Sequence, residues 1–362
     1  MDVNVETYAL NIEQTANLIK SVPSRTVLVQ GHMGTGKSSL LQVLASEHPE
    51  HTPIYFDCTT RDLGDLMLPN VGSDAECMSF LPNEELGLHL DGPVIVMLDE
   101  YGKANRSVAL ALLRLMLERK MGSYTLHPDS IVFATTNLGS EGVGDILPPH
   151  ARNRMSVVTM RKPTKDEWIL WAVGAGVDPI IMGWVNENPQ VFQSFLEVRD
   201  PDDNPYIFHP QSSASAFVTP RSLETASRFV EKRAEMDDTS LTTALIGSIG
   251  LRGALDLQVF IKLANDLPKM ADIKNDPENA LVPENPAAVC LVVMKVLQTV
   301  EPEWASAWVK YMDRLPAEAR GMFARLVGKD NFNAERRNVM MQNQDYGNWV
   351  MQNMHLFTSD KK

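Results

Sequence analysis

The sequence predicts an α/β fold in which helices sandwich a parallel sheet, followed by an all-helical lid and a C-terminal helical region. Three observations predict this fold class. Short apolar runs alternate with helical patterns up to about residue 160, a glycine-rich loop joins the first run to a helix, and the remaining sequence is almost wholly helical. Alternating strands and helices favour a parallel sheet with helices on both faces.

Five apolar runs are short enough to be strands and are rich in β-branched or aromatic residues. The third run is apolar throughout, which is typical of a strand buried on both faces. Helical spacing of apolar side chains predicts helices over 38–46 and 107–119. The predicted strands are 26–30, 54–58, 93–98, 131–134 and 156–160.

The character of the sequence changes near residue 160. Thr164 and Glu167 form a capping-box pattern, and Thr219 followed by Pro220 opens a further helix. We therefore expect an α/β core at 1–162, a helical lid at 163–267 and a C-terminal helical region at 268–362. The sequence does not indicate a role for this last region.

Composition and charge narrow the possible partners. The chain has 362 residues and a formal net charge of −13, with 46 acidic against 33 basic side chains, so nucleic acid is not the expected partner. Its three cysteines form no CxxC pair, which argues against a disulfide framework or a zinc site and fits a reducing cytosol. No apolar run approaches the ~20 residues needed to cross a bilayer, and the N-terminus lacks a secretory pattern. We expect a cytoplasmic protein without a membrane segment.

The glycine-rich loop at 31–38 (GHMGTGKS) fits the pattern G-x-x-x-x-G-K-[ST] and lies between a predicted strand and a predicted helix. In this pattern, backbone N–H groups wrap the phosphates of ATP, and glycine permits the close approach. Lys37 is predicted to reach the β- and γ-phosphates, and Ser38 is predicted to ligate Mg²⁺. The residues predicted to bind the nucleotide are Gly31, His32, Met33, Gly34, Thr35, Gly36, Lys37, Ser38 and Ser39.

Polar residues at the ends of two further strands are candidates for catalysis. Asp99 and Glu100 follow the third strand, so Asp99 is predicted to hold Mg²⁺ and Glu100 to polarise the attacking water. Asn137 follows the fourth strand, at the edge where open α/β sheets bind their ligands, and could orient the same water. Arg152 and Arg154 precede the last strand. A guanidinium suits a transferring phosphoryl group, but both could equally belong to a solvated turn.

These elements, in this order, resemble the AAA+ superfamily of ATPases and, within it, the MoxR-type proteins. The resemblance covers roughly residues 10–265 and implies the AAA+ P-loop fold. The stretches that carry it are 62–66 with Pro69, Asp99-Glu100 with Ala104, 109–118, 134–137, Leu147-Pro148 with Arg154, and 219–222.

Carried over residue by residue, the resemblance implies three further roles. Asn137 is implied to be sensor 1, and Arg221, on the lid, to contact the γ-phosphate in its own subunit. Arg154 is implied to be an arginine finger that acts on the ATP of the neighbouring subunit. A finger of this kind implies a homo-oligomeric ring, usually of six subunits in such families.

The sequence departs from the family pattern at two places. Residues 101–103 are YGK, where the family usually has Asn-Arg. Asn153 and Met155 flank the predicted finger in place of Asp and Phe. Arg152 therefore stays open as an alternative finger, and Arg154 is preferred.

MoxR-type proteins are implied to act as chaperone-like ATPases that mature partner complexes, often with a von Willebrand A domain protein. The resemblance and the acidic charge favour an ATPase that remodels a protein client. A compact, Met-rich, single-module ATPase of this kind could be bacterial or phage-encoded, and the sequence leaves both origins open. The alternative is the motor of a nucleic-acid-processing or defence system, such as a helicase loader or a restriction-type motor, which needs a basic pore lining. Segment 61–90 is a candidate for the lining of the pore. Apart from His89, its one basic residue is Arg61, whereas its acidic residues are Asp62, Asp65, Asp74, Glu76, Glu84 and Glu85. Such a segment is poorly suited to bind DNA.

Overall fold

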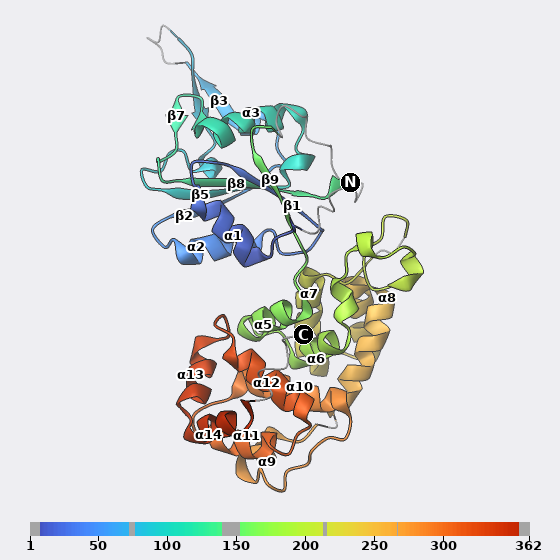
Figure 1. Cartoon of the computed structure of the whole chain (residues 1–362). Coiled ribbons are helices and arrows are strands. Elements are labelled where there is room, and N and C mark those ends of the chain that lie inside the picture. Colours follow the sequence, from blue (N-terminus) through green and yellow to red (C-terminus); the bar gives the residue numbers. More distant parts are fainter. Residues whose placement is uncertain (1–7, 72–76, 140–152, 213–215, 266, 355–362) are drawn as a thin grey trace. The chain divides into compact units, whose positions relative to one another are not determined.

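The structure is a computed structural model of the whole chain, and it describes residues 8–71, 77–139, 153–212, 216–265 and 267–354. Contacts divide the chain into two compact units, Met1–Lys162 and Pro163–Lys362. Figure 1 shows both units, and each is described here by itself.

The first unit is built on a five-stranded sheet in the order β2-β5-β8-β1-β9, and every pair of neighbouring strands is parallel. Each of the five predicted apolar runs lies on one of these strands. The predicted fold class, a parallel sheet between helices followed by a helical region, is confirmed. The strands are β1 (Val27–Gly31), β2 (Thr52–Asp57), β5 (Val94–Asp99), β8 (Ile131–Asn137) and β9 (Ser156–Met160).

Helices cover both faces of the sheet (Figure 1). Helices α1 (Ile12–Ser21) and α2 (Ser39–Glu47) share a hydrophobic cluster with Val27 and Val29 of β1. Helix α3 (Arg106–Glu118) shares a second cluster with Leu28, the residue between them. Successive strand residues thus face opposite helices, as the two-residue period of a strand requires.

The parallel register brings the ends of several strands to one edge. Gly31 of β1 lies beside Asn137 of β8 and beside Met160 of β9, and Asp57 of β2 lies beside Asp99 of β5. In open parallel sheets, the carboxyl edge of the strands is where ligands bind. The glycine-rich loop and the acidic pair therefore start from the same edge.

Two short antiparallel hairpins extend the first unit, and the sequence did not predict either as strands. The first is β3 (Met67–Asn70) with β4 (Ser79–Pro82), and the second is β6 (Lys120–Met121) with β7 (Tyr124–Thr125). The backbones of the hairpins approach closely at Gly122, which has φ 60°, and a Cβ atom there would lie 2.9 Å from the carbonyl oxygen of Phe80. The two hairpins therefore contact one another.

The second unit is helical. One hydrophobic cluster includes buried side chains from Trp168 to Trp349, so helices on both sides of the predicted 267/268 boundary share one core. The boundary itself stays a prediction. The helices are α5 (Lys165–Ala175), α6 (Pro179–Glu187), α7 (Pro220–Glu231), α8 (Asp238–Asn265), α9 (Met270–Asn275), α10 (Pro286–Thr299), α11 (Ala305–Met312), α12 (Ala317–Gly328), α13 (Ala334–Gln342) and α14 (Gln344–Gln352).

Helix α8 contains the one segment of the described residues, 238–264, that is long and apolar enough to cross a membrane by length and composition. Gly250 interrupts it with φ 78° and ψ 165°, which are not helical angles. Each half is shorter than the ~20 residues that a membrane helix needs. The segment is therefore two helices of the second unit joined at a kink.

Candidate nucleotide site

The glycine-rich loop requires glycine at three positions. A Cβ atom on Gly31 would lie 2.7 Å from the carbonyl oxygen of Met160, because β9 passes directly beside it. Gly34 and Gly36 have φ 69° and 92°, in the left-handed region that other residues rarely adopt. The loop then enters α2, which begins at Ser39. The predicted strand–loop–helix context is present, and a loop of this kind can bind a phosphate through its backbone N–H groups.

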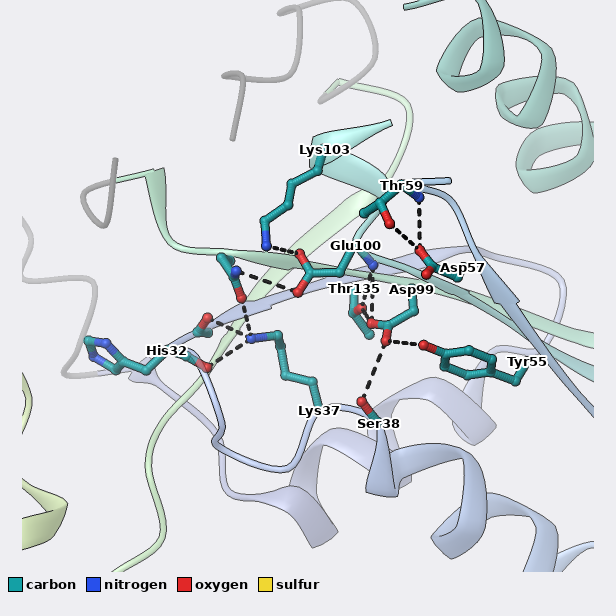
Figure 2. Close-up of polar contacts among 12 residues, drawn as sticks. His32, Lys37, Ser38, Tyr55, Asp57, Thr59, Asp99, Glu100, Lys103 and Thr135 are labelled. Atoms are coloured by element: carbon teal, nitrogen blue, oxygen red, sulfur yellow. Dashed lines mark hydrogen bonds and ion pairs between the residues drawn. The ribbon is translucent and has the colours of Figure 1, made fainter. Parts of the chain in front are cut away.

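The ammonium of Lys37 is buried and donates hydrogen bonds to three oxygen atoms. It lies 2.9 Å from the carbonyl oxygen of Gly31, 2.8 Å from that of His32 and 2.8 Å from Oδ1 of Asn137 (Figure 2). A buried ammonium needs such acceptors to offset its desolvation. Lys37 thus connects the loop to the end of β8.

Asp99 is buried at the end of β5, and hydroxyl groups surround its carboxylate. Oδ2 accepts hydrogen bonds from Tyr55 at 3.0 Å and from Ser38 at 3.5 Å. Oδ1 accepts one from the hydroxyl of Thr135. Carboxylate and hydroxyl oxygens are hard ligands that suit Mg²⁺, and those of Asp99 and Ser38 already lie close together. The donor set therefore fits the predicted metal role of these two residues.

Glu100 lies next to this group in a left-handed conformation, with φ 53°. Its backbone N–H lies 3.2 Å from the hydroxyl oxygen of Thr135 and donates to it. Its carboxylate contacts the ammonium of Lys103 at 2.9 Å and the side-chain amide of Asn137 at 3.5 Å. Figure 2 shows Lys103 reaching across to Glu100, on the side away from Ser38. Glu100, Asn137 and Lys37 are therefore linked in one chain of polar contacts.

Asp57, the last residue of β2, and Cys58, which follows it, have local structural roles. Asp57 accepts hydrogen bonds from the backbone and the hydroxyl of Thr59, at 2.8 Å and 2.7 Å, which fixes the turn after β2. Burial raises the pKa of the Cys58 thiol well above its usual range. The thiol stays protonated at neutral pH, so Cys58 is not a nucleophile candidate.

The predicted finger lies away from this edge. Arg154 is exposed and precedes β9, whose first residue, Ser156, pairs with Val27 at the start of β1. It therefore lies toward the edge of the sheet opposite the glycine-rich loop. The alternative finger, Arg152, and the Leu147-Pro148 stretch lie outside the described residues.

Arg221 belongs to the helical unit. It is exposed and follows Pro220 in the first turn of α7, which the side chain of Thr219 caps. The predicted helix start at 219–220 is present. The role of Arg221 toward a γ-phosphate stays a prediction.

The structure adds three residues to which the sequence gave no role. Tyr55 and Thr135 position the carboxylate of Asp99, and Lys103 pairs with Glu100. Thr135 lies in the stretch ATTN that carried the resemblance, and Lys103 lies in the stretch that departs from it. Tyr55 belongs to no motif, and only the pairing of β2 with β5 reveals it.

No family model matches the chain, and no curated protein matches it. Among solved structures, it is similar to a candidate ATPase from Cytophaga hutchinsonii, with 14% identity, 87% of this chain and 81% of the other covered, and a TM-score of 0.32. It is also similar to two single-substitution variants of RuvB from Thermotoga maritima. For these, identity is 12% and 15%, coverage is 94% of this chain and 86% and 87% of the others, and the TM-scores are 0.37 and 0.35.

Likenesses this weak say nothing of substrate, partner or assembly. The strand order, the glycine-rich loop and the acidic residues at the end of β5 are observations on the chain itself. Together they define its fold as a parallel α/β sheet with a P-loop.

Proposed function

We propose that this chain is a Mg²⁺-dependent ATPase, a MoxR-like AAA+ protein that works as a homo-oligomeric ring of six subunits in the cytoplasm. ATP hydrolysis would drive the remodelling or maturation of a protein partner. The observation that supports the proposal is the convergence of Lys37, Ser38, Asp99, Glu100 and Asn137 at one edge of the sheet. These residue types are the ones that phosphoryl transfer to water requires.

Each of these side chains has a proposed task. Backbone N–H groups of 31–39 and the ammonium of Lys37 bind the phosphates of ATP. Ser38 and Asp99 hold Mg²⁺, which supplies positive charge to the phosphate oxygens. Glu100 accepts a proton from the attacking water, and Asn137 orients that water beside it. Arg221 contributes a further positive charge from the lid.

The position of Arg154 supports a ring. On the edge of its own sheet opposite the loop, it is badly placed for ATP bound in its own subunit. If this guanidinium acts on an ATP, that ATP therefore belongs to another copy of the chain. A head-to-tail contact that closes on itself gives a ring.

The first hairpin supports a protein partner. Apolar side chains of the segment around β3 and β4 are largely exposed, and they are accompanied by acidic residues of the same segment. Such a surface suits a polypeptide better than a phosphate backbone. A client, or a partner with a von Willebrand A domain, would therefore bind there. The exposed apolar residues are Leu63, Leu68, Val71, Met78 and Leu81.

The variant Glu100→Gln tests the proposed chemistry, because it keeps the size and removes the base. We expect unchanged ATP binding, an unchanged native mass in the presence of ATP, and a rate of hydrolysis lower by about 100-fold or more. Glu118→Gln, at an exposed position that ends α3, is the matched control and should keep the wild-type rate. Wild-type hydrolysis by Glu100→Gln would refute the assignment.

The alternative function, a nucleic-acid motor, makes a different prediction. Its ATPase rate would rise several-fold with single- or double-stranded DNA, and the stimulation would fall with salt. The proposed function predicts no such stimulation. Measuring the same ATPase rates with and without DNA decides between the two.

A further inference from the structure

A cluster of two histidines and a glutamate lies on the first unit, away from the nucleotide site. His48, Glu50 and His51 follow α2 and lead into β2, whose first residue is Thr52. One ring nitrogen of each histidine and a carboxylate oxygen of Glu50 all lie within 4.8 Å of one another. The glycine-rich loop precedes α2, and these three residues follow the C-terminal end of the same helix. The cluster therefore shares no residue with the proposed ATPase site.

The ring of His51 is oriented by a carbonyl group. Its Nε2 lies 3.0 Å from the backbone oxygen of Asp129, and a carbonyl oxygen can only accept a hydrogen bond. Nε2 therefore carries the proton. In the neutral ring, Nδ1 then presents a lone pair.

That lone pair faces another electron-rich atom. Nδ1 of His51 lies 3.0 Å from Oε1 of Glu50, and Nδ1 of His48 lies 3.3 Å from the same oxygen. A carboxylate oxygen is an acceptor, so a neutral His51 and Glu50 repel unless a cation lies between them. Either a second proton on His51 or a metal ion removes the conflict.

We propose that His48, Glu50 and His51 bind a divalent transition-metal ion of the zinc class. Imidazole nitrogens and a carboxylate oxygen are ligands that Zn²⁺ takes, and three protein ligands leave a fourth position to water. A histidine ligand usually donates its other N–H to a carbonyl or carboxylate, as His51 does to Asp129. The lack of CxxC pairs in the sequence argued against a zinc site with cysteine ligands. The site proposed here has no cysteine ligand.

The surroundings suit entry of an ion and a fixed position for it. The side chain of His51 is 7% exposed and that of Glu50 is 58% exposed, so the site has one buried and one open side. Pro49, between the ligands, fixes one backbone torsion and lowers the entropy lost on binding. Binding would join the end of α2 to the turn that contains Asp129, just before β8. The ion thus stabilises the first unit and takes no part in hydrolysis.

The test uses the full chain without an affinity tag, treated with a chelator and dialysed, and the probe is Zn²⁺ alone. Calorimetric titration should show one Zn²⁺ per chain for the wild type. His51→Asn removes the imidazole, and Glu50→Gln keeps the size of the glutamate. Both should bind at least about 10-fold more weakly. His89→Asn, at an exposed histidine outside the cluster, is the control and should bind as the wild type does.

Thermal unfolding gives a second measurement that needs no ATPase activity. Because a ligand of the folded state raises stability, Zn²⁺ should raise the melting temperature of the wild type and of His89→Asn, and not that of His51→Asn. Absence of binding to the wild type would mean that a proton fills the place of the ion, and it would overturn the proposal. So would binding that is equally tight in His51→Asn.

Discussion

The position of Arg154 leads to a quantitative prediction about hydrolysis between subunits. In β9, Ser156 pairs with Val27 and Met160 pairs with Gly31, at the loop. Four steps of about 3.3 Å separate Ser156 from Met160, so the backbone of Arg154 lies more than about 13 Å from the loop. If Arg154 stabilises the transition state, the ATP that it serves belongs to a neighbouring subunit.

Two variants make this reasoning measurable. Arg154→Ala should bind ATP normally and hydrolyse it about 1,000-fold more slowly, the lower end of the range for arginine fingers. Glu100→Gln should be inactive through loss of the base. In rings mixed at random from equal amounts of both, about a quarter of the interfaces combine an intact Glu100 with an intact Arg154. Hydrolysis should therefore return to about a quarter of the wild-type rate if interfaces act independently.

The assay is steady-state ATP hydrolysis across mixing ratios, with native mass spectrometry to confirm that the rings are mixed. Arg114→Ala is the control, because Arg114 is exposed and its ion pair within the described residues is with Glu118 on its own helix. Near-wild-type activity of Arg154→Ala alone would remove it as the finger. Mixed rings that stay inactive would refute action between subunits.

Two further predictions concern the glycine-rich loop and Asp99, the proposed metal ligand. Gly31→Ala places a Cβ atom 2.7 Å from a carbonyl oxygen of β9 and should cost about 1–3 kcal/mol, seen as a lower melting temperature and weaker ATP binding. Gly92→Ala, where a Cβ atom would meet nothing within 4 Å, should change neither. Tyr55→Phe removes the hydroxyl that donates to Asp99 at 3.0 Å, so ATP binding should require several-fold more Mg²⁺ while binding without Mg²⁺ stays unchanged. An unchanged Mg²⁺ requirement would show that Tyr55 does not position Asp99.

The sheet could be predicted from the sequence because each of its strands is an apolar run bounded by breaks. Every residue of β5 is buried, and burial on both faces leaves a continuous apolar pattern. The hairpins have no such pattern. Strand β3 reads Met-Leu-Pro-Asn with three of its four residues exposed, and β6 and β7 have two residues each. Strands this short and this exposed are specified by their contacts with each other, which a local pattern does not contain.

The candidate site also contains residues that the sequence could predict and contacts that it could not. Lys37, Ser38 and Asp99 could be named because the spacing of a loop and the end of a buried strand are local features. The contact of Tyr55 with Asp99 joins residues 44 positions apart and depends on the register of β2 against β5. The pairing of Lys103 with Glu100 depends on a turn after β5. Glu100 and Lys103 are only three residues apart, but their pairing needs that turn, which the sequence did not predict.

Glu100 shows how the fold holds the proposed catalytic carboxylate in place. A left-handed conformation costs a residue with a Cβ atom about 1–2 kcal/mol, and Glu100 adopts it with φ 53°. Its N–H donates to Thr135 and to Oδ1 of Asp99, and its carboxylate pairs with Lys103. These contacts offset the cost, and they turn the chain sharply so that adjacent carboxylates serve different tasks. In an extended strand, successive side chains point to opposite faces, and Asp99 and Glu100 could not share one site. In the proposed mechanism, one carboxylate binds the metal ion and the next accepts a proton. The strained conformation of Glu100 lets these adjacent residues take both roles at one site.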